Sequence, residues 1–486
     1  MHPPVERCEL APGLSISRVL TGLWQIADLE RDGRTLDPER TADEMLPYVR
    51  AGLTTFDMAD HYGSAEEISG VFRHRHADAG PVEMLTKWVP EPGRTTREQV
   101  RAAVERARTR LRSDHIDLLQ FHAWNFPDPG WLDTLGFLEE LRDEGLIGHL
   151  GLTNFDTAHL AIALHTGYRI VSNQVCFSLL DRRPAGGMTG LCLERGVKLL
   201  AFGTLAGGFL IERWLGRPEP SVDDLETWSL MKYKRFIDAA GGWARFQGVL
   251  EAVHDVADKH EVSMANVACR HVLDEPAVGG IIVGARLGRS AHIADNLRVF
   301  TFVLDEEDRA RIDEAVARLD PIPGDSGDEY RRPPFLTATG DLSQHVTSFP
   351  APWPATPGPM GRTRVRTGTP WEDDAGFSRA VRVGDRIVVS GTTATHGRRP
   401  IGGSDPAAQL HFIVDKIEGA LHSLGGRLED VVRTRIYVAE RADVEAISRA
   451  HGRRFGHIRP ANTLVRAGII GPEYLVEMEA EAVVGT

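Results

Sequence analysis

Four polar residues in the first third of the chain have the types and the spacing needed for proton-transfer chemistry. Asp57 and Tyr62 lie in the run TFDMADHYG, Lys87 lies in MLTKW, and His122 lies in LLQFHAW. Each lies at or just past the end of a short apolar run that is typical of a buried strand. Barrel enzymes carry their chemistry at such strand ends, so the pattern predicts an active site.

A tyrosine hydroxyl is a weak acid, since its ordinary pKa is about 10, and it needs a nearby cation to stabilise its phenolate. Lys87 is the expected cation for Tyr62, and Asp57 is expected to keep Lys87 charged through an ion pair. His122 is expected to hydrogen-bond a substrate carbonyl oxygen and orient it. Together the four residues predict protonation of an alkoxide as it forms. The alternative is that they are ordinary polar residues at strand ends, which their joint spacing disfavours.

The elements that position these residues follow an alternating pattern up to about residue 320. Eight short apolar runs alternate with longer amphipathic runs, which is typical of parallel βαβ units. The candidate strands are residues 17–23, 54–58, 82–87, 116–122, 147–154, 168–177, 197–203 and 278–285. The candidate helices are residues 41–52, 64–75, 96–111, 131–145, 155–167 and 188–196. We therefore expect an α/β fold, a (β/α)8 TIM barrel, with residues 211–242 as an insertion after the seventh strand on the active-site face.

Composition sets broad limits on the class of protein. The chain has 486 residues, which is more than one core usually organises, so two or more domains are expected. The net charge of -13 argues against a general nucleic-acid or anionic-membrane binder, although a local basic patch can still hold a phosphate. The four cysteines lie far apart without a C-x-x-C pair, so neither a metal site nor a disulfide framework is expected. The sequence predicts a cytoplasmic protein without a membrane span.

The pattern changes after the expected barrel, which we assign to residues 1–320. Prolines crowd together in residues 321–361, as in FPAPWPATPGPMG, and predict a semi-rigid linker. Residues 362–486 then contain a candidate strand pair at 378–395, an amphipathic helix at 407–426, a strand at 431–439 and two closing strands. Strands grouped around one or two helices predict a small α+β domain.

The segment from about residue 10 to 320 resembles the aldo-keto reductases. The motifs FD-x-A-x-x-YG, TKW and FH occur in the same order as the catalytic motifs of that family. The resemblance implies that Asp57, Tyr62, Lys87 and His122 form the catalytic tetrad, with Tyr62 as the proton donor. It also implies NADPH as the cofactor, with NADH as the second choice, bound in an extended form across the carboxyl end of the barrel.

The same resemblance implies a set of residues around the nicotinamide. Thr153 and Asn154 in GLTNF, with Gln174 in SNQVCF, match the positions that hold the carboxamide, which an amide pair recognises well. Phe202 lies where relatives often have a tyrosine that stacks on the ring. The remaining implied contacts are Gly22, Trp24, Gly203 and Leu205. The alternatives are a structural role for the two amides and a core role for Phe202.

The run IIVGARLGRSAHIADN resembles the family's segment for the adenosine phosphate, where a strand leads into a short helix. Gly284, Ala285 and Asn296 match this segment, but two more residues lie between Ala285 and Asn296 than in relatives. Arg286 and Arg289 are the candidate ligands of the 2′-phosphate, because a guanidinium binds phosphate in a bidentate way. The alternative is that both are solvated surface charges, so NADPH is only favoured over NADH.

The tail from about residue 364 resembles the Rid (YjgF) family of enamine/imine deaminases, through SGTTAT, DVVRTRIYV, AHGRRFG, RPANT and LVEMEAEAVV. The resemblance implies a chorismate-mutase-like fold and homotrimers, or higher homo-oligomers, with clefts between subunits. Ser390 and Glu477 match residues of that cleft. Asn462 lies where deaminating members have an arginine that binds the substrate carboxylate, and Arg459 is the candidate substitute.

Three functions remain open from the sequence. The first is NAD(P)H-dependent reduction of an aldehyde, a ketone or an imine by the barrel, with the tail for trimerisation or ligand binding. The second is a bifunctional enzyme in which the tail processes an imine or enamine that feeds the reductase. The third is a non-catalytic nucleotide-binding assembly module, which the intact tetrad disfavours. The identity of the small-molecule substrate and the direction of reaction have no transferable pattern.

Overall fold

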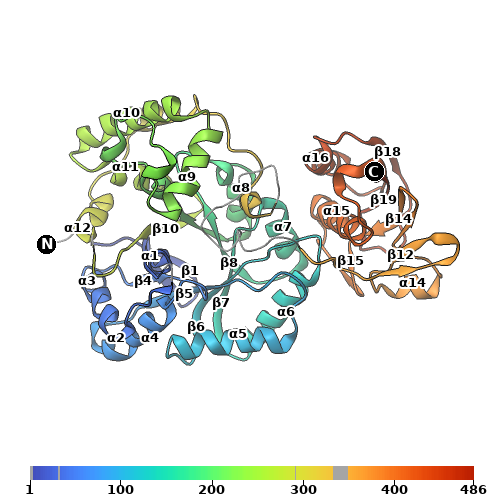
Figure 1. Cartoon of the computed structure of the whole chain (residues 1–486), viewed down its shortest axis with the longest axis horizontal. Coiled ribbons are helices and arrows are strands. Elements are labelled where there is room, and N and C mark those ends of the chain that lie inside the picture. The colour runs from blue at the N-terminus through green and yellow to red at the C-terminus, as the bar shows by residue number, and fades with distance from the viewer. Residues whose placement is uncertain (1–3, 31–32, 290–291, 332–348, 486) are drawn as a thin grey trace.

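A closed barrel of eight parallel strands forms the larger part of the protein, as seen in a computed structural model that describes residues 4–30, 33–289, 292–331 and 349–485 (Figure 1). Its strands follow in chain order around the barrel, and the last pairs with the first. They are β3 (Val19–Gly22), β4 (Thr55–Asp57), β5 (Glu83–Trp88), β6 (Ile116–Phe121), β7 (Ile147–Thr153), β8 (Ile170–Cys176), β9 (Lys198–Phe202) and β10 (Val278–Gly284). All eight candidate strands overlap these elements, so the predicted (β/α)8 barrel is confirmed.

Helices surround the barrel and connect its strands. The longer ones are α4 (Ala65–Arg75), α5 (Arg97–Arg110), α6 (Gly130–Asp143), α7 (Thr157–Thr166), α8 (Gly187–Arg195), α11 (Met264–Leu273) and α13 (Glu306–Val316). Local sequence fixes their starts, since Thr96 and Gln99 form a capping box for α5 and the Asp156 carboxylate caps α7. Shorter pieces are α1 (Trp24–Leu29), α2 (Pro38–Thr41), η2 (Ala42–Met45), α3 (Leu46–Arg50), η3 (Ala77–Ala79), η4 (Arg183–Ala185), α12 (Ile293–Asn296) and η8 (Leu297–Phe300).

The expected single helix at 41–52 is wrong, because this stretch is divided among α2, η2 and α3. Pro47 lies in the first turn of α3, where its missing N–H is tolerated, whereas inside a continuous helix it would remove a backbone hydrogen bond. An antiparallel hairpin of β1 (Arg7–Ala11) and β2 (Leu14–Ser17) precedes the barrel and was not expected. Its apolar residues pack with barrel residues such as Leu85 and Leu118, away from the catalytic end.

The insertion after the seventh barrel strand is present and is largely helical. It contains η5 (Ala206–Gly208), η6 (Glu212–Trp214), η7 (Val222–Asp224), α9 (Trp228–Ala239) and α10 (Trp243–His260). Phe209, Trp214, Phe236 and Trp243 belong to a second apolar cluster beside the barrel core. The first helix residue, Trp228, lies 5.8 Å from the Trp24 ring, so α9 reaches the predicted active-site end.

The tail folds as one seven-stranded sheet with helices on one face. The strand order is β11-β12-β13-β14-β19-β17-β18, and only β17 and β18 pair in parallel. The strands are β11 (Ala355–Pro357), β12 (Thr363–Val365), β13 (Ala380–Val383), β14 (Arg386–Thr393), β17 (Val431–Val438), β18 (Ala461–Arg466) and β19 (Val476–Val483). The other elements are η11 (Pro359–Gly361), α14 (Pro370–Asp374), α15 (Pro406–Ser423), η12 (Leu428–Asp430), α16 (Val444–Phe455) and the hairpin β15 (Thr395–His396) with β16 (Arg399–Pro400).

The interval expected as linker takes part in both folded units. A short turn, η9 (Asp328–Tyr330), packs on the barrel and buries Glu329, while β11 is an edge strand of the tail sheet. Residues 332–348 of the expected linker lie outside the described residues. The domain boundaries at 320 and 361 therefore stay predictions, although folded contacts extend into the interval from both ends.

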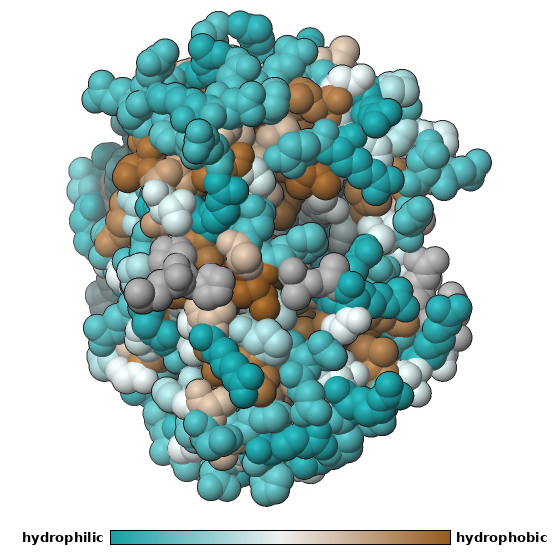
Figure 2. All heavy atoms as spheres, turned by 90° about the vertical axis from the view of Figure 1, so that its left-hand side faces the viewer, coloured by the Kyte–Doolittle hydropathy of each residue, from teal (hydrophilic) through white to brown (hydrophobic). Residues whose placement is uncertain are grey.

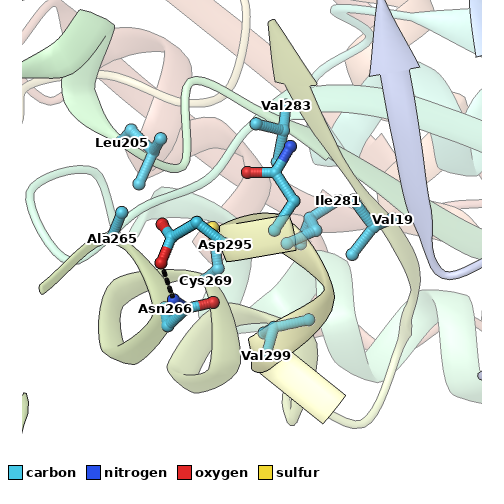
Figure 3. Close-up of a pocket in the computed structure, with 10 residues that line it drawn as sticks. Val19, Leu205, Ala265, Asn266, Cys269, Ile281, Val283, Asp295 and Val299 are labelled. Carbon is cyan, nitrogen blue, oxygen red and sulfur yellow. Dashed lines mark hydrogen bonds between the residues drawn. The ribbon is translucent and has the colours of Figure 1, made fainter. Parts of the chain in front are cut away.

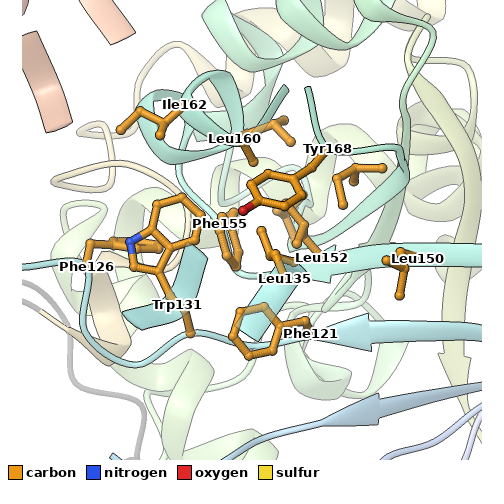
Figure 4. Close-up of a cluster of buried hydrophobic side chains, with 14 of the residues drawn as sticks. Phe121, Phe126, Trp131, Leu135, Leu150, Leu152, Phe155, Leu160, Ile162 and Tyr168 are labelled. Atoms are coloured by element: carbon orange, nitrogen blue, oxygen red, sulfur yellow. The ribbon is translucent and has the colours of Figure 1, made fainter. Parts of the chain in front are cut away.

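The tail packs directly on the barrel through α15 and α7, which lie side by side (Figure 1). Helix α15 is buried on nearly all sides, because one face covers the tail sheet and the other meets α7. Phe126, Trp131 and Phe155 form an aromatic cluster (Figure 4), and Phe126 stacks on His159 of α7 at this junction. The two units consequently share one apolar core.

The surface on the side of α3 and α12 is mostly hydrophilic, with apolar side chains in small patches (Figure 2). No helix of the described residues is long and apolar enough to cross a membrane. By contrast, the tail sheet exposes Val388, Val465 and Val483 on the face turned away from its helices.

Candidate active site

The four predicted catalytic residues come together at the carboxyl end of the barrel. Asp57 ends β4, Lys87 lies near the end of β5, His122 follows β6, and Tyr62 lies in the turn before α4. Lys87 Nζ donates to both Asp57 carboxylate oxygens, at 2.9 and 2.8 Å, and lies 4.9 Å from the centre of the Tyr62 ring. The tetrad thus has the geometry of a cation held beside a phenol.

Asp57 and Lys87 are each only 3–4% exposed, so their charges interact in a largely water-free site. Burial lowers the pKa of Lys87, and the Asp57 carboxylate opposes this effect. Asp57 also accepts hydrogen bonds from Gln174 Nε2 at 2.6 Å and from Gln120 Nε2 at 3.2 Å. The carboxylate is therefore held by three side chains, and it fixes the position of the ammonium.

His122 is a neutral imidazole in this site. Burial holds its pKa well below the usual range, and the positive charges of Arg331, His61 and Lys232 lower it further. The ring packs against Trp124 at 4.6 Å. Its Nε2 atom is buried and finds no hydrogen-bond partner among the described residues. A buried ring nitrogen without a partner is suited to a ligand oxygen.

Aromatic side chains form the walls around Tyr62 and His122. The Trp24 ring lies edge-on to Tyr62 at 5.0 Å. The ring of Trp228, from the insertion, lies 5.8 Å from the Trp24 ring. Tyr330, from the turn η9, lies edge-on to His122 at 5.7 Å. The site therefore combines an apolar aromatic lining with a few polar groups, as small-molecule sites usually do.

Thr153, Asn154 and Gln174 lie at the ends of neighbouring strands β7 and β8. Asn154 has a left-handed backbone, with φ of 55°, and its N–H donates to the Gln174 carbonyl oxygen at 2.8 Å. Its side-chain Oδ1 is buried without a partner among the described residues. A carboxamide N–H would satisfy this oxygen, so these residues fit a nicotinamide. The Gln174 amide nitrogen is engaged by Asp57 and Gln120, which links the expected cofactor residue to the tetrad.

The other expected nicotinamide contacts surround this point. Phe202 ends β9 and is partly buried, and Gly203 follows it with φ of 70°. A side chain at Gly203 would lie 1.9 Å from the Tyr233 hydroxyl, so only glycine fits there. Gly22 pairs with Gly284 across β3 and β10, and the side-chain oxygen of nearby Gln25 is buried without a partner among the described residues. Sequence reasoning missed Gln25.

At the expected phosphate end, Leu205 and Asn296 line one small pocket between the barrel and α11 (Figure 3). Asn266 donates to Asp295 at its edge, at 3.0 Å. Arg286 and Arg289 are both exposed beyond β10. The structure thus brings Leu205 and Asn296 together and leaves both arginines at the surface, where they stay candidate ligands.

The four tail candidates do not form one cleft within a single chain. Asn462 accepts from Thr434 at 3.1 Å and belongs to the helix-covered face, since Thr434 is buried there. Glu477 lies on the opposite face, between the buried residues Val476 and Met478. The Ser390 hydroxyl donates a hydrogen bond to the Ser378 carbonyl oxygen, and the Arg459 guanidinium donates one to the carbonyl oxygen of Gly456. A cleft that contains all four would need residues from more than one chain.

Comparisons with known proteins decide the family of the barrel. Residues 18–317, more than half of the chain, match the family model described as "Aldo/keto reductase family". The chain belongs to the aldo/keto reductase family. It is therefore an NAD(P)H-dependent oxidoreductase. Residues 371–484 match the model described as "Endoribonuclease L-PSP", which confirms the expected resemblance of the tail to the YjgF family.

Individual relatives match one part of this reductase or the other. "Aldo-keto reductase YhdN" of Bacillus subtilis is 25% identical over 341 residues, which cover 66% of this chain and 96% of that protein. The solved structure of a glycerol dehydrogenase from Gluconobacter oxydans matches with a TM-score of 0.52 and 24% identity, over 66% of this chain and 97% of that one, and shows the fold alone. The tail is 42% identical over 120 residues to "Uncharacterized protein SCO2049" of Streptomyces coelicolor, covering 24% of this chain and 90% of that protein.

Sequence reasoning missed four residues of the candidate active site, namely Trp228, Lys232, Tyr330 and Arg331. Arg331 donates to the carbonyl oxygens of Ala123 and Asn154, so it ties together the loops after β6 and β7. The first two residues come from the insertion, and the last two come from the interval expected as linker. Their only sequence signal was aromatic and basic content in segments without periodicity, which does not indicate where a side chain points.

Proposed function

We propose that the reductase transfers a hydride from NADPH, with NADH as the second choice, to the carbonyl carbon of an aldehyde or ketone, or to an imine. Tyr62 is the proton donor. The observation that supports this proposal is the buried Lys87–Asp57 pair beside the Tyr62 ring, opposite a neutral His122 whose Nε2 is free for a ligand. The nicotinamide, when bound, supplies the hydride.

The residues of the chain have separate roles in this proposal. His122 donates a hydrogen bond from Nε2 to the carbonyl oxygen and orients it. Tyr62 gives its hydroxyl proton to that oxygen as the carbonyl becomes an alcohol. The Lys87 ammonium stabilises the resulting phenolate, and Asp57 keeps this ammonium in place. Tyr62 is then reprotonated from solvent, so the reaction consumes one proton for each hydride.

The direct test is the substitution Tyr62→Phe, with Tyr48→Phe as the control. Tyr48 is also a buried tyrosine, but it lies in α3, outside the tetrad. Loss of the proton donor should lower kcat by about 10²- to 10⁴-fold, as expected for a general acid. The dissociation constant of NADPH, measured by fluorescence titration, should change little. Turnover by the Tyr62 variant at the rate of the control would exclude Tyr62 as the proton donor, whereas no turnover by the unmodified protein would favour a barrel that binds nucleotide without chemistry.

For the tail we propose assembly as the main role, as a homotrimer or a higher homo-oligomer. The supporting observation is the open face of its sheet, which exposes Val388, Val465 and Val483 beside charged residues such as Glu481. An apolar sheet face of this kind is typical of an interface. NADPH preference, the cytoplasmic location and the substrate remain predictions.

A second role of the tail is processing of an imine or enamine that feeds the reductase. The observation in its favour is Glu477 on the open face, because burial raises the pKa of its carboxyl group and favours a proton-carrying form. The test is ammonia release from a freshly generated 2-imino acid by the full chain. Activity that disappears in Glu477→Gln supports this role, and its absence from the unmodified protein excludes it for this substrate.

A further inference from the structure

Lys232 on α9 is a buried lysine in the catalytic centre that the tetrad does not use. It is 8% exposed, and its ammonium donates to the Tyr330 hydroxyl at 2.5 Å. The same Nζ atom lies 5.2 Å from the ring of Phe202, the residue expected beside the nicotinamide. Tyr330 lies edge-on to His122 at 5.7 Å, so Lys232 contacts a neighbour of His122 as well as Phe202.

The charge of Lys232 lacks a close counterion in the described part of the chain. No carboxylate oxygen among those residues lies within 4.0 Å of its Nζ atom. Glu329 directly precedes Tyr330 in the chain, and its carboxylate is bound by Arg183 at 2.9 Å. Arg183 in turn binds Asp181 at 2.6 Å. Lys232 and Glu329 attract each other without forming an ion pair, since the charge of Lys232 contributes to the lowered pKa of Glu329. The second carboxylate oxygen of Glu329, Oε1, is buried without a hydrogen-bond partner among the described residues, so Glu329 compensates Lys232 only at a distance. The positive charge of Lys232 also reaches His122, because it lowers the pKa of that ring.

A buried ammonium of this kind is costly unless an anion or several acceptors compensate it. An ammonium has three donors, and the Tyr330 hydroxyl is the one hydrogen-bond acceptor found for it among the described residues. The other surroundings are the faces of Phe202, Tyr233 and Tyr330, which give a weaker cation–π attraction. The remaining donors therefore suit an anionic group that arrives with a ligand.

We propose that Lys232, held beside Tyr330, binds an anionic group of the substrate, such as a carboxylate. His122 and Tyr62 hold the carbonyl oxygen at the other end of the bound substrate. The substrate class is then an aldehyde or ketone that carries an acid group, with apolar atoms against Trp24 and Trp228. This inference rests on the proposed reductase function. The diphosphate of the cofactor has the same anionic chemistry and is the competing source.

The experiment compares acids with their methyl esters as substrates. The probes are 2-, 3- and 4-formylbenzoate, 4-oxobutanoate and the methyl ester of each, which differ in charge but little in shape. The variants are Lys232→Met, Lys232→Arg and Lys234→Met in the full chain. Lys234 lies on the same helix but pairs with Glu219 and Asp238 instead, so it controls for general effects of charge loss. NADPH binding to each variant is measured separately by fluorescence titration.

The unmodified protein should prefer at least one acid over its ester by about tenfold or more in kcat/KM. Lys232→Met should lower kcat/KM for that acid by about 30-fold, mainly through KM, which is the range for a hydrogen bond to a charged group. The loss for the ester should be at least about tenfold smaller than the loss for the acid, and Lys232→Arg should retain part of the preference. Lys234→Met should behave as the unmodified protein.

Other outcomes overturn the inference. An equal loss for acid and ester in Lys232→Met, or no acid preference in the unmodified protein, would exclude an anion site for the substrate. A raised dissociation constant for NADPH with an unchanged acid preference would assign Lys232 to the cofactor phosphates. Reduction of the esters alone would leave the proposed reductase function intact, whereas no reduction of any probe by the unmodified protein would count against that function.

Discussion

At the scale of single residues, Asp57 is the centre of the site. Its carboxylate accepts from Lys87, Gln120 and Gln174, so one residue joins the proton-relay side chains to an expected cofactor residue. Its charge opposes the effect of burial on Lys87, because burial lowers the lysine pKa while Asp57 raises it. The charge state of Lys87 therefore depends on this one neighbour more than on any other side chain of the site.

The substitution Asp57→Asn should lower the pKa of Lys87, because it removes the main group that raises it. The ammonium that stabilises the Tyr62 phenolate would then be lost at a lower pH. We expect kcat to fall by about 10- to 100-fold near neutral pH, and the alkaline limb of the pH profile of kcat to move to lower pH. The measurement is kcat between pH 5 and about 10.

Asp60→Asn provides a graded control, since Asp60 also raises the pKa of Lys87 but by less than Asp57. Its alkaline limb should move in the same direction by a smaller amount. A profile of Asp57→Asn that coincides with the unmodified protein would mean that Lys87 does not carry the charge on which turnover depends.

The site residues were predictable where a short sequence motif marks the end of a strand. The motifs FDMADHYG, TKW and FH predict the tetrad, because each motif places a polar residue at the end of a buried strand. Lys232 and Tyr330 were not predictable, because they come from segments far apart in the chain and meet only in the folded barrel. The unpartnered oxygen of Asn154 likewise depends on its left-handed backbone, which no pattern in the sequence reveals.

At the scale of elements, the contact between α7 and α15 depends on a buried charged histidine. The His159 ring lies between the Asp156 carboxylate on its own helix and the Asp415 carboxylate on α15, at 2.7 and 2.8 Å. It stacks on Phe126 at 3.5 Å, and Arg454 of α16 also binds Asp415. Burial disfavours the charged ring, but the two carboxylates outweigh burial and raise the pKa of His159.

A raised pKa in the folded state gives stability that is fully present below the ordinary histidine pKa of about 6.5 and is lost as pH rises through the folded value. The stability of the full chain should therefore fall on the alkaline side of neutrality. His159→Gln should remove this dependence and should cost about 3–5 kcal/mol near pH 6, as expected when one partner of a buried ion pair is removed. The measurement is unfolding in urea from pH 6 to about 10.

Neighbouring groups titrate at lower pH than His159, so the comparison is made above pH 7. Burial beside Asp156 raises the pKa of Asp325 to about 6, and burial beside Arg454 lowers that of His411 to about 3. His76→Gln is the control, because His76 pairs with Asp43 near the surface. Parallel stability curves for the unmodified protein and His159→Gln above pH 7 would show that the charge of His159 does not hold the helices together.

Most elements were predictable from periodicity, and the failures have physical reasons. Strands buried on both faces read as continuous apolar runs, which is why all eight barrel strands were found. Helix α9, with the sequence WSLMKYKRFIDA, was not predicted, because the buried Lys232 interrupts the apolar pattern of its buried face. The sequence also gave no sign that α15 would be covered on its second face by α7.

At the scale of the whole molecule, the tail is a structural part of the reductase rather than a tethered module. Gly419 of α15 lies so close to the barrel that an added side-chain carbon would be 2.4 Å from the Pro127 carbonyl oxygen. Contacts continue inward, since His159 stacks on Phe126 and the Arg331 guanidinium lies 4.4 Å from the Phe126 ring. Arg331 holds the carbonyl oxygen of Asn154, which connects the junction with the expected nicotinamide site.

Removal of the tail and removal of the assembly should therefore have different effects. Truncation after Pro350 exposes the face of α7 that α15 covers, so we expect a lower unfolding temperature and weaker NADPH binding. Val388→Asp places a charge on the open sheet face, far from α7, and should reduce the mass in solution while the tail stays docked. Its turnover and NADPH affinity should stay within about twofold of the unmodified protein, because no group of the site changes.

Mass in solution, unfolding temperature and NADPH oxidation are measured for both variants in parallel. If Val388→Asp loses both assembly and turnover, a neighbouring chain must contribute to the catalytic site. If the truncated chain is as stable and active as the full chain, the path from Asp415 through His159, Phe126 and Arg331 has no energetic role. We expect neither of these two outcomes. Catalysis should need the docked tail of its own chain and should not need the oligomer.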